Sequence, residues 1–275
     1  MGWGLENRLA RIIRPGTSKA LMLAVDHGYF LGPTSGLENA RQTIAPLLPY
    51  TDSLMLTRGI LRSSVDAKTN TPIVLRVSGG NSVLDEDLSN EDITVSIEDA
   101  IRLNASALAL SIYVGSEHQH KTLVNLSKLV DKGEEYGITI LAVTAVGKEM
   151  ARDERYLSLA SRIAAELGAH IVKTYYCQDF SKLIQKTPIP VVIAGGKKIG
   201  ELDALKLTYN AIEDGAVGVD MGRNIFQSEN PVAMIQAVRS IVHEGFSVKK
   251  AFSLLENLKK NKKIKLRDQA IALNS

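Results

Sequence analysis

Eight short apolar segments, separated by stretches with helical periodicity, restrict the fold of this sequence more than any other feature. Most of them are continuously apolar rather than alternating, as in parallel strands that are buried on both faces. Eight strand–helix units in about 250 residues predict a closed (β/α)8 TIM barrel rather than a doubly wound open sheet, because eight strands close this kind of barrel. The segments span residues 20–26, 53–57, 72–77, 107–114, 138–143, 169–174, 190–196 and 216–222.

The stretches between these segments carry the start and stop signals of helices. Asn230 and Pro231 suit the N-cap and the first position of a helix, and Gly168 follows another periodic stretch as a stop. No linker rich in Gly, Ser or Pro divides the chain. We therefore expect residues 1–275 to form a single barrel domain, with a Lys-rich C-terminal helix or tail at about 256–275 whose charges face solvent.

Composition excludes several classes of protein. The formal net charge is +3 over 275 residues and its lysines crowd the tail, which does not suggest a nucleic-acid partner. A single cysteine, Cys177, permits no disulfide within the chain and suits a reducing compartment. The charged N-terminus does not resemble a signal peptide, and no apolar run approaches the roughly 18 residues of a membrane span. We expect a cytoplasmic protein without a membrane partner.

Polar residues stand where the predicted strands end, which is where functional groups gather in a barrel. Their convergence on one mouth is more informative than any single motif. The third segment also carries Arg76. The candidate site residues are Asp26, His27, Arg58, Lys173, Gly195, Gly196, Gly222 and Arg223.

Lys173 ends the sixth apolar segment, where a lysine is costly to desolvate. Free lysine has a pKa of about 10.4 and is not nucleophilic, but burial and nearby cations lower that value and free a neutral amine to attack a carbonyl. Lys173 is therefore a candidate for a Schiff base. The alternative is a structural ion pair with Asp26 or another carboxylate. The polar residues at the ends of the other predicted strands favour a catalytic role for Lys173.

Asp26 and His27 follow the first predicted strand. Asp26 could move protons or orient Lys173, or it could only form an Asx-turn or cap a helix. His27 could donate to a substrate oxygen or phosphate, or it could cap a loop. The sequence leaves these alternatives open.

Glycine-containing loops follow the last two predicted strands, at Gly195–Gly196 and at Gly222–Arg223. Glycine lets backbone N–H groups approach an anion, and a short helix can aim its N-terminus at the same point. One glycine pair is usually just a tight turn. Two loops on adjacent strands, in the recurring phosphate position of barrels and with Arg223 for a bidentate contact, predict a phosphate site.

Two other groups of residues are weaker candidates. Cys177 lies four residues beyond Lys173, but no neighbouring histidine marks it as an activated thiol. His118 and His120 follow the fourth segment, with only Glu117 as a further ligand nearby. We therefore predict a loop cysteine and no metal site.

Several motifs are familiar as a set. The segments AVDHG, IVKTYY, VVIAGGKK and GVDMGRNIFQ together resemble the archaeal-type (DhnA-like) class I aldolase family, whose members are (β/α)8 barrels. The resemblance extends from about Trp3 to about Leu258. It implies that Lys173 is the Schiff-base lysine and that Asp26 is the aspartate of the first strand. It also implies that the two glycine loops bind phosphate.

Other segments are similar to one branch of that family, a thiolase group that processes autoinducer-2. These are LMLAVDHGYFLGPTSGLE, LTRGILRS and IVKTYYC. The branch implies that a phosphorylated hydroxypentanedione reacts with coenzyme A to give dihydroxyacetone phosphate and acetyl-coenzyme A. Coenzyme A would be a co-substrate, and no bound cofactor or metal is implied, because an iminium ion supplies the electrophilic stabilisation that zinc would otherwise give. The family also implies a homo-oligomer, a pentamer or decamer.

One departure from the family separates the alternatives. Fructose-bisphosphate aldolases of the family carry a proton-donating tyrosine after the fifth strand, whereas residues 143–148 here read VTAVGK, with Ala145 in the tyrosine position. A class I aldolase acting on fructose 1,6-bisphosphate or a related sugar phosphate, or an aminodideoxyheptulosonate synthase, is the enzymatic alternative. If an acid is needed, Tyr113 or Tyr175 near a strand end could supply it. A sugar-phosphate binding barrel, which would not need Lys173, is the non-enzymatic alternative.

Overall fold

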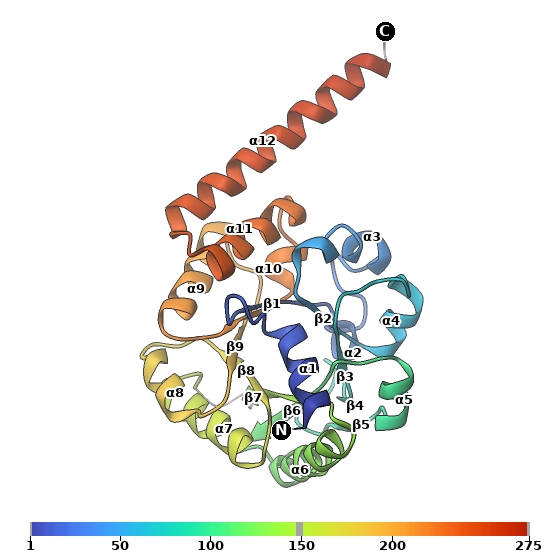
Figure 1. Cartoon of the computed structure of the whole chain (residues 1–275), viewed down its shortest axis with the longest axis vertical. Helices are drawn as coiled ribbons and strands as arrows, with labels where there is room; N and C mark the ends of the chain where they lie inside the picture. The colour runs from blue at the N-terminus through green and yellow to red at the C-terminus, as the bar shows by residue number, and fades with distance from the viewer. Residues whose placement is uncertain (1, 147–150, 274–275) are drawn as a thin grey trace.

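Eight parallel strands close into a barrel in the order β1-β10-β9-β8-β7-β6-β3-β2, as predicted (Figure 1). The computed structural model describes residues 2–146 and 151–273, with side chains for all of these except residue 146 and residues 262–273. Each predicted apolar segment forms one barrel strand. The strands are β1 (Ala20–Ala24), β2 (Ser53–Leu56), β3 (Ile73–Arg76), β6 (Ala107–Val114), β7 (Thr139–Val146), β8 (Ile171–Tyr175), β9 (Val191–Ala194) and β10 (Gly218–Met221).

Helices surround the barrel (Figure 1). The predicted cap is confirmed: the Asn230 side chain accepts a hydrogen bond from the Ala233 N–H, and Pro231 is the first residue of its helix. The helices are α1 (Trp3–Ile12), α2 (Gly28–Leu31), α3 (Ala40–Ile44), η1 (Leu48–Tyr50), α4 (Arg58–Ser64), α5 (Ile97–Arg102), α6 (Gln119–Tyr136), α7 (Glu154–Glu166), α8 (Phe180–Lys186), α9 (Glu201–Glu213), α10 (Arg223–Phe226), α11 (Pro231–Glu244) and α12 (Val248–Leu273).

A small antiparallel hairpin, which the sequence did not predict, interrupts the β3–α5 connection. Its strands are β4 (Ser78–Gly79) and β5 (Asp92–Ile93), and Ser78 pairs with Ile93. The hairpin begins only two residues after β3 ends, so it remains close to the mouth of the barrel.

Two apolar clusters form the core. One fills the space between the strands and the outer helices, and the other fills the barrel itself. Ile12 of α1 is fully buried in the inner cluster, together with residues such as Met22 and Met55. Figure 1 shows α1 lying across the ring of strands. Because α1 closes the end where the strands begin, the opposite end is the one left available for a site.

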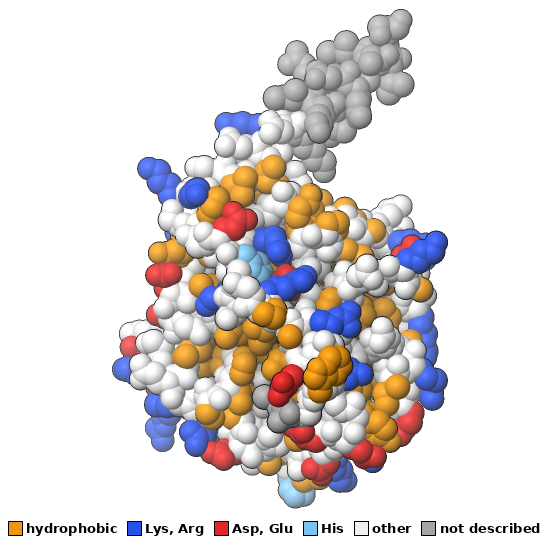
Figure 2. Space-filling view, in the orientation of Figure 1, with side chains coloured by type: hydrophobic (Ala, Val, Ile, Leu, Met, Phe, Trp, Pro, Cys, Tyr) orange, Lys and Arg blue, Asp and Glu red, His pale blue; other side chains and the backbone are white. Residues whose placement is uncertain are grey.

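The first part of helix α12 packs against α9 and α11, and the helix then extends away from the barrel (Figure 1). Ala251 and Leu255 anchor its first turns in the core, and Figure 2 shows apolar side chains gathered around the start of this helix. Lys259 is not the solvent-facing charge that the sequence predicted. Its side chain is 12% exposed, and its ammonium lies 3.1 Å from Glu229 and 3.3 Å from Glu256. Lys259 thus binds α12 to its neighbours.

Among the described residues, no helix combines the length and the apolar character that crossing a membrane requires.

Candidate active site

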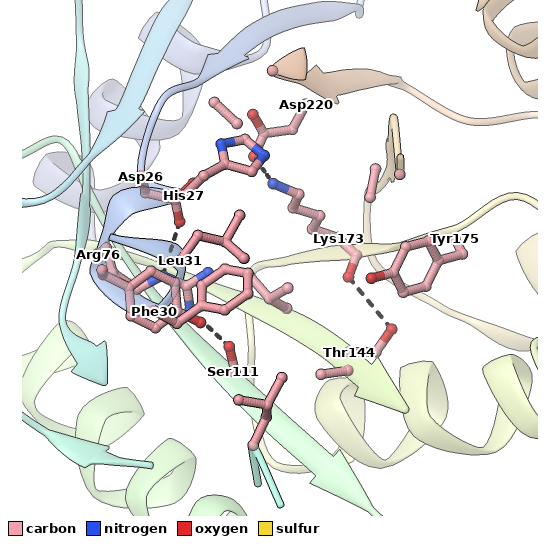
Figure 3. A pocket seen from close by; sticks show the side chains of 18 of the residues that line it. Asp26, His27, Phe30, Leu31, Arg76, Ser111, Thr144, Lys173, Tyr175 and Asp220 are labelled. Atoms are coloured by element: carbon pink, nitrogen blue, oxygen red, sulfur yellow. Dashed lines mark hydrogen bonds and ion pairs between the residues drawn. The ribbon is translucent and has the colours of Figure 1, made fainter. Parts of the chain in front are cut away.

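A cavity of about 400 Å³ opens at the carboxyl ends of the strands. Among the charged side chains that line it, four buried ones come from four different strands or strand ends, namely Asp26, Arg76, Lys173 and Asp220 (Figure 3). All four are less than 10% exposed. The predicted residues that line this cavity are Asp26, His27, Lys173, Gly195, Gly196, Gly222 and Arg223.

Arg58 does not line the cavity, so the structure does not bring it together with the other predicted site residues. Thr57 caps α4 and accepts a hydrogen bond from the Ile60 N–H, so Arg58 is already the first residue of that helix. Its guanidinium extends outward and donates to Asp99 of α5 at 3.2 Å. The helix starts immediately after β2 and carries Arg58 away from the mouth.

Lys173 lies in the middle of β8, and its side chain enters the cavity (Figure 3). Its ammonium nitrogen lies 2.8 Å from Oδ2 of Asp220 and 3.6 Å from the sulfur of Met55. The ion pair that the sequence left open therefore exists, but with Asp220 rather than Asp26. A buried amine held beside one carboxylate at the edge of a cavity is in position to meet a carbonyl carbon.

Asp26 is held by Arg76 instead. The Nε of Arg76 donates to Oδ2 of Asp26 at 3.0 Å, and both side chains are 6% exposed. Burial alone would raise the pKa of Asp26, but the charges of Arg76 and Lys173 outweigh it and lower that pKa. Asp26 is thus a persistent carboxylate beside the lysine, and its side chain is engaged by Arg76 rather than in capping a helix.

A polar network behind Arg76 fixes its direction. Its Nη1 donates to the Ser111 hydroxyl at 2.8 Å, and its guanidinium stacks 4.7 Å from the centre of the Tyr29 ring. Buried Glu91 then accepts hydrogen bonds from the hydroxyls of Tyr29 at 2.7 Å and Tyr113 at 2.9 Å. The hairpin loop thereby holds the guanidinium from behind.

Tyr113 is poorly suited to supply an acid. Burial, Tyr29 and Glu91 raise the pKa of its hydroxyl, which already donates its proton to Glu91. The other candidate, Tyr175, lines the cavity with the Arg152 guanidinium 3.9 Å from its ring centre. Ala145 also lines the cavity and brings no acidic group to it. Val143 and Thr144 of the VTAVGK segment line the cavity too, whereas residues 147 and 148 and the side chain of residue 146 lie outside the part of the chain that the structure describes.

His27 is a neutral imidazole in this setting. Burial lowers the pKa of His27 to about 4. The negative charge of Asp26 would raise this pKa, but the cations of Lys173, Arg223 and Arg76 oppose that effect. Its ring meets the edge of Phe226 at 5.7 Å. The buried Nδ1 has no hydrogen-bond partner within the part of the chain that the structure describes, and His27 caps no helix with its side chain. It is therefore available to a ligand.

The two predicted phosphate loops lie side by side because Asn224 joins them. Its amide donates to the Gly195 carbonyl at 2.7 Å, and its carbonyl oxygen accepts from the Ile199 N–H at 2.9 Å. Gly222 has no space for a side chain, since a Cβ would lie 2.3 Å from the Ala24 carbonyl oxygen. The buried Nε of Arg223 has no partner within the described residues. Arg223 also lines the cavity.

The weaker candidates, Cys177, His118 and His120, do not line the cavity, although Asp87 beside His118 does. Cys177 is buried outside the cavity, and burial raises its thiol pKa to about 11, which is opposite to the shift of an activated cysteine. Asp87, Glu117 and His118 have possible metal-ligating atoms within 4.8 Å of one another, and His120 is not part of this group. Two of the three are exposed, and exposed groups of this kind are common without a metal ion.

Two of the buried charged residues of the cavity, Asp220 and Arg76, were missed as site residues from the sequence. Asp220 stands inside the apolar segment GVDMG rather than at its end, and Arg76 was noted without a role. The alternation of side chains along a strand could have identified Asp220. If one residue of a strand faces inward, the residue two positions further along faces inward as well. In β10 this places Gly218 and Asp220 on the inner side.

Comparisons with known proteins agree with this geometry. A family model described as "DeoC/LacD family aldolase" matches residues 20–228. The chain is 58% identical to an uncharacterized aldolase of Pasteurella multocida (strain Pm70), over 92% of this chain and 88% of that protein. It is 56% identical to the 3-hydroxy-5-phosphonooxypentane-2,4-dione thiolase of Photorhabdus laumondii subsp. laumondii, over 92% and 87% of the two chains.

Solved structures extend the comparison. An archaeal fructose 1,6-bisphosphate aldolase matches with a TM-score of 0.78 and 28% identity, covering 88% of this chain and all of that one (100%). Another structure of an archaeal fructose-1,6-bisphosphate aldolase, described with its catalytic lysine covalently bound to the carbinolamine intermediate of the substrate, matches with a TM-score of 0.78 and 27% identity, covering 87% and 99% of the two chains.

Proposed function

The chain belongs to the DeoC/LacD family of aldolases, and from this membership and its cavity we propose that it is a thiolase that uses coenzyme A. The substrate would be 3-hydroxy-5-phosphonooxypentane-2,4-dione, the compound in the name of relatives that are 56–57% identical. The products would be dihydroxyacetone phosphate and acetyl-coenzyme A. The observation that carries the proposal is the buried Lys173 amine in one cavity with the unfilled donor of Arg223.

Phosphate recognition sets the position of the substrate. The loops at Gly195–Gly196 and Gly222–Arg223 would bind the phosphate, with Arg223 supplying charge. The carbonyl carbon next to the phosphate-bearing carbon is C4. With the phosphate in these loops, C4 is the carbonyl that we assign to Lys173.

Covalent catalysis then follows from the amine. Lys173 would add to C4 and lose water to give an iminium ion, as the family relative with a carbinolamine on its lysine suggests. The coenzyme A thiolate adds to the C2 carbonyl, and the C2–C3 bond breaks. The acetyl group leaves on sulfur and the bonding electrons pass to C3, where the iminium nitrogen stabilises them as an enamine. The thiol proton ends on C3, and hydrolysis of the imine releases dihydroxyacetone phosphate.

The charged neighbours suit this sequence of steps. Asp26, held as an anion by Arg76, offsets the positive charge of the iminium nitrogen. Neutral His27 has a free ring nitrogen for a substrate oxygen. The iminium is itself the electron sink, so the mechanism requires coenzyme A as a co-substrate but no bound cofactor or metal.

An aldolase acting on fructose 1,6-bisphosphate or a related sugar phosphate is the second candidate, favoured by the structural relatives at 27–28% identity. An aminodideoxyheptulosonate synthase would use the same lysine. A sugar-phosphate binding barrel would need the loops but would give Lys173 no role. The family resemblance further supports a homo-oligomer, pentameric or decameric, working in the cytoplasm on breakdown of autoinducer-2.

The deciding experiment is an assay of acetyl-coenzyme A. The purified protein is incubated with the phosphorylated dione and coenzyme A, and acetyl-coenzyme A and dihydroxyacetone phosphate are measured together. We expect equal amounts of both, and neither when coenzyme A is omitted. Cleavage without coenzyme A would indicate an aldolase. Tight binding without any product, and without borohydride trapping of the ligand, would indicate a binding protein.

A further inference from the structure

Asp220 is the carboxylate that faces the Lys173 amine. It projects from β10 into the cavity, its side chain is 0% exposed, and its Oδ2 lies 2.8 Å from the lysine nitrogen. Figure 3 shows the two groups pointing toward one another. The contact is direct, so a proton can pass between them without an intervening group.

Asp220 differs from Asp26 and Asp52 in the kind of group that stabilises its charge, which is a lysine amine that can give up a proton rather than an arginine. Asp26 accepts from Arg76, and Asp52 accepts from Arg14, Arg239 and a backbone N–H. Apart from the contact with Lys173, neither Asp220 oxygen has a hydrogen-bond partner among the residues that the structure describes. A buried carboxylate with a single partner gives up little by accepting that partner's proton.

The surrounding charges point the same way. The groups that face Asp220 are Lys173 on β8, Asp26 after β1 and Arg76 on β3. Burial, reinforced by the negative charge of Asp26, raises the pKa of Asp220 despite the opposing effect of the two cations. Asp26 is unsuited to the same task, because Arg76 and Lys173 lower its pKa.

We propose that Asp220 is the proton acceptor and donor for Lys173 during imine formation. This rests on the imine step of the proposed function, not on coenzyme A. Asp220 first takes one proton from the ammonium, which leaves a neutral amine and a neutral carboxylic acid. The amine adds to the carbonyl carbon, and its second proton moves to the oxygen, giving a neutral carbinolamine. Asp220 then returns its proton to the carbinolamine hydroxyl, water leaves, and the iminium ion faces a restored carboxylate.

The test is the rate of imine formation, measured separately from thiolase turnover. Dihydroxyacetone phosphate is mixed with the protein, borohydride is added after set intervals, and the mass of the intact protein reports the trapped fraction. We expect Asp220→Asn and Asp220→Ala to form imine at least about a hundredfold more slowly, the typical contribution of a positioned acid–base group. Asp214→Asn is the matched control, because Asp214 accepts from Tyr176 and does not line the cavity. Its rate should be unchanged.

Rescue distinguishes proton transfer from simple charge balance. Formate should accelerate imine formation in Asp220→Ala in proportion to its concentration, and chloride at the same concentration should not. Variants that trap within about threefold of the unmodified rate would overturn the proposal. So would slow variants that formate does not accelerate, since Asp220 would then only hold the ammonium in place.

The unmodified protein gives an answer even if both variants fail to fold. If the proton cycles between Asp220 and Lys173, the rate of imine formation should stay flat across neutral pH. If the ammonium must lose its proton to water, the rate of imine formation should rise with pH across the same range, and the proposal fails. Because no coenzyme A is present, a failed acetyl-coenzyme A assay with normal trapping would overturn the thiolase and leave the role of Asp220 standing.

Discussion

At the scale of single residues, the proposed chemistry depends on an amine that can exist without its proton. Lys173 is 8% exposed and touches one carboxylate and one sulfur. An arginine in its place would keep the positive charge but could not become a nucleophile, because its guanidinium does not deprotonate in proteins. Charge and nucleophilicity can therefore be separated at this position.

We expect Lys173→Ala and Lys173→Arg to fold and to lose activity by at least about a hundredfold, since either change removes a catalytic group outright. The formation of acetyl-coenzyme A measures the loss of turnover, and borohydride trapping measures the loss of the covalent adduct. Circular dichroism spectra of the variants serve as the control for folding. An arginine variant with a near-normal rate would show that charge alone suffices and that no imine forms.

Arg223 offers a separate test of phosphate recognition. Arg223→Ala should raise the KM for the phosphorylated dione roughly tenfold to a hundredfold, the equivalent of about 1.5–3 kcal/mol for a hydrogen bond to a charged group. A dephosphorylated analogue should be affected little. Arg58→Ala is the control, because Arg58 pairs with Asp99 outside the cavity. Equal losses on both substrates would mean that Arg223 does not bind the phosphate.

At the scale of elements, the strands were predictable and the directions of some side chains were not. Continuously apolar segments mark buried parallel strands, and all eight are present. The residue at which a helix begins after a strand is harder to predict. The cap at Thr57 places Arg58 in the first turn of α4 and therefore outside the cavity. Asp220 was not predicted as a site residue because it stands inside its strand rather than after it, although the alternation of side chains along a strand places it on the inner side.

The end of the barrel opposite the cavity has its own charged centre. Asp52, at the start of β2, is fully buried and accepts from Arg14 at 3.0 Å, Arg239 at 3.1 Å and the Leu21 N–H at 2.7 Å. His243 of α11 lies 2.7 Å from the same carboxylate. One side chain thus joins the first strands to α11.

Asp52→Asn should lower the free energy of unfolding by about 2–3 kcal/mol, because it leaves two arginines without their counter-charge, although both are partly exposed to water. The pKa of Asp52 is lowered from 3.8 to about 2 by its hydrogen bonds, against burial, which alone would raise it. A lowered pKa stabilises the folded state above about pH 4, and this contribution, about 2 kcal/mol, is lost as the pH falls toward 2.

Urea unfolding of the wild type and of Asp52→Asn tests this at several pH values. The difference between the two proteins should be largest near neutral pH and should narrow as the pH falls from 4 toward 2. Borohydride trapping by the folded variant should be unchanged, because Asp52 lies at the far end of the barrel. A difference that does not vary with pH would assign the effect to packing rather than to charge.

At the scale of the whole molecule, the fold does not distinguish a thiolase from an aldolase, and the side chain at position 145 favours one of the two reactions. The barrel, the lysine and the two glycine loops would suit a thiolase and an aldolase equally well. The sequence identified the family from segments spread over nearly the whole chain, and the family model confirms it. Neither the sequence nor the cavity shows where the nucleotide part of coenzyme A binds, because that part needs no group at the reacting centre.

Ala145 separates the two reactions through their protons. Aldol cleavage requires a base to take a hydroxyl proton from the leaving half, and the reverse reaction requires an acid to return it. Such a group contributes typically 10²–10⁴-fold. Transfer of an acetyl group to a thiolate leaves an acyl product and does not demand the same phenol. Ala145 lines the cavity without an acidic group, and the hydroxyl of Tyr113 is engaged by Glu91.

We therefore expect the unmodified protein to cleave fructose 1,6-bisphosphate very poorly, and we expect Ala145→Tyr to restore part of that activity. The assay follows triose phosphate from purified protein and fructose 1,6-bisphosphate, with borohydride trapping on dihydroxyacetone phosphate as the control that Lys173 is intact in both proteins. Robust cleavage by the unmodified protein, at about 1 s⁻¹ or more, would remove the thiolase assignment. Since Tyr113 is engaged, Tyr175 at the cavity wall would then be the first acid to test, by Tyr175→Phe.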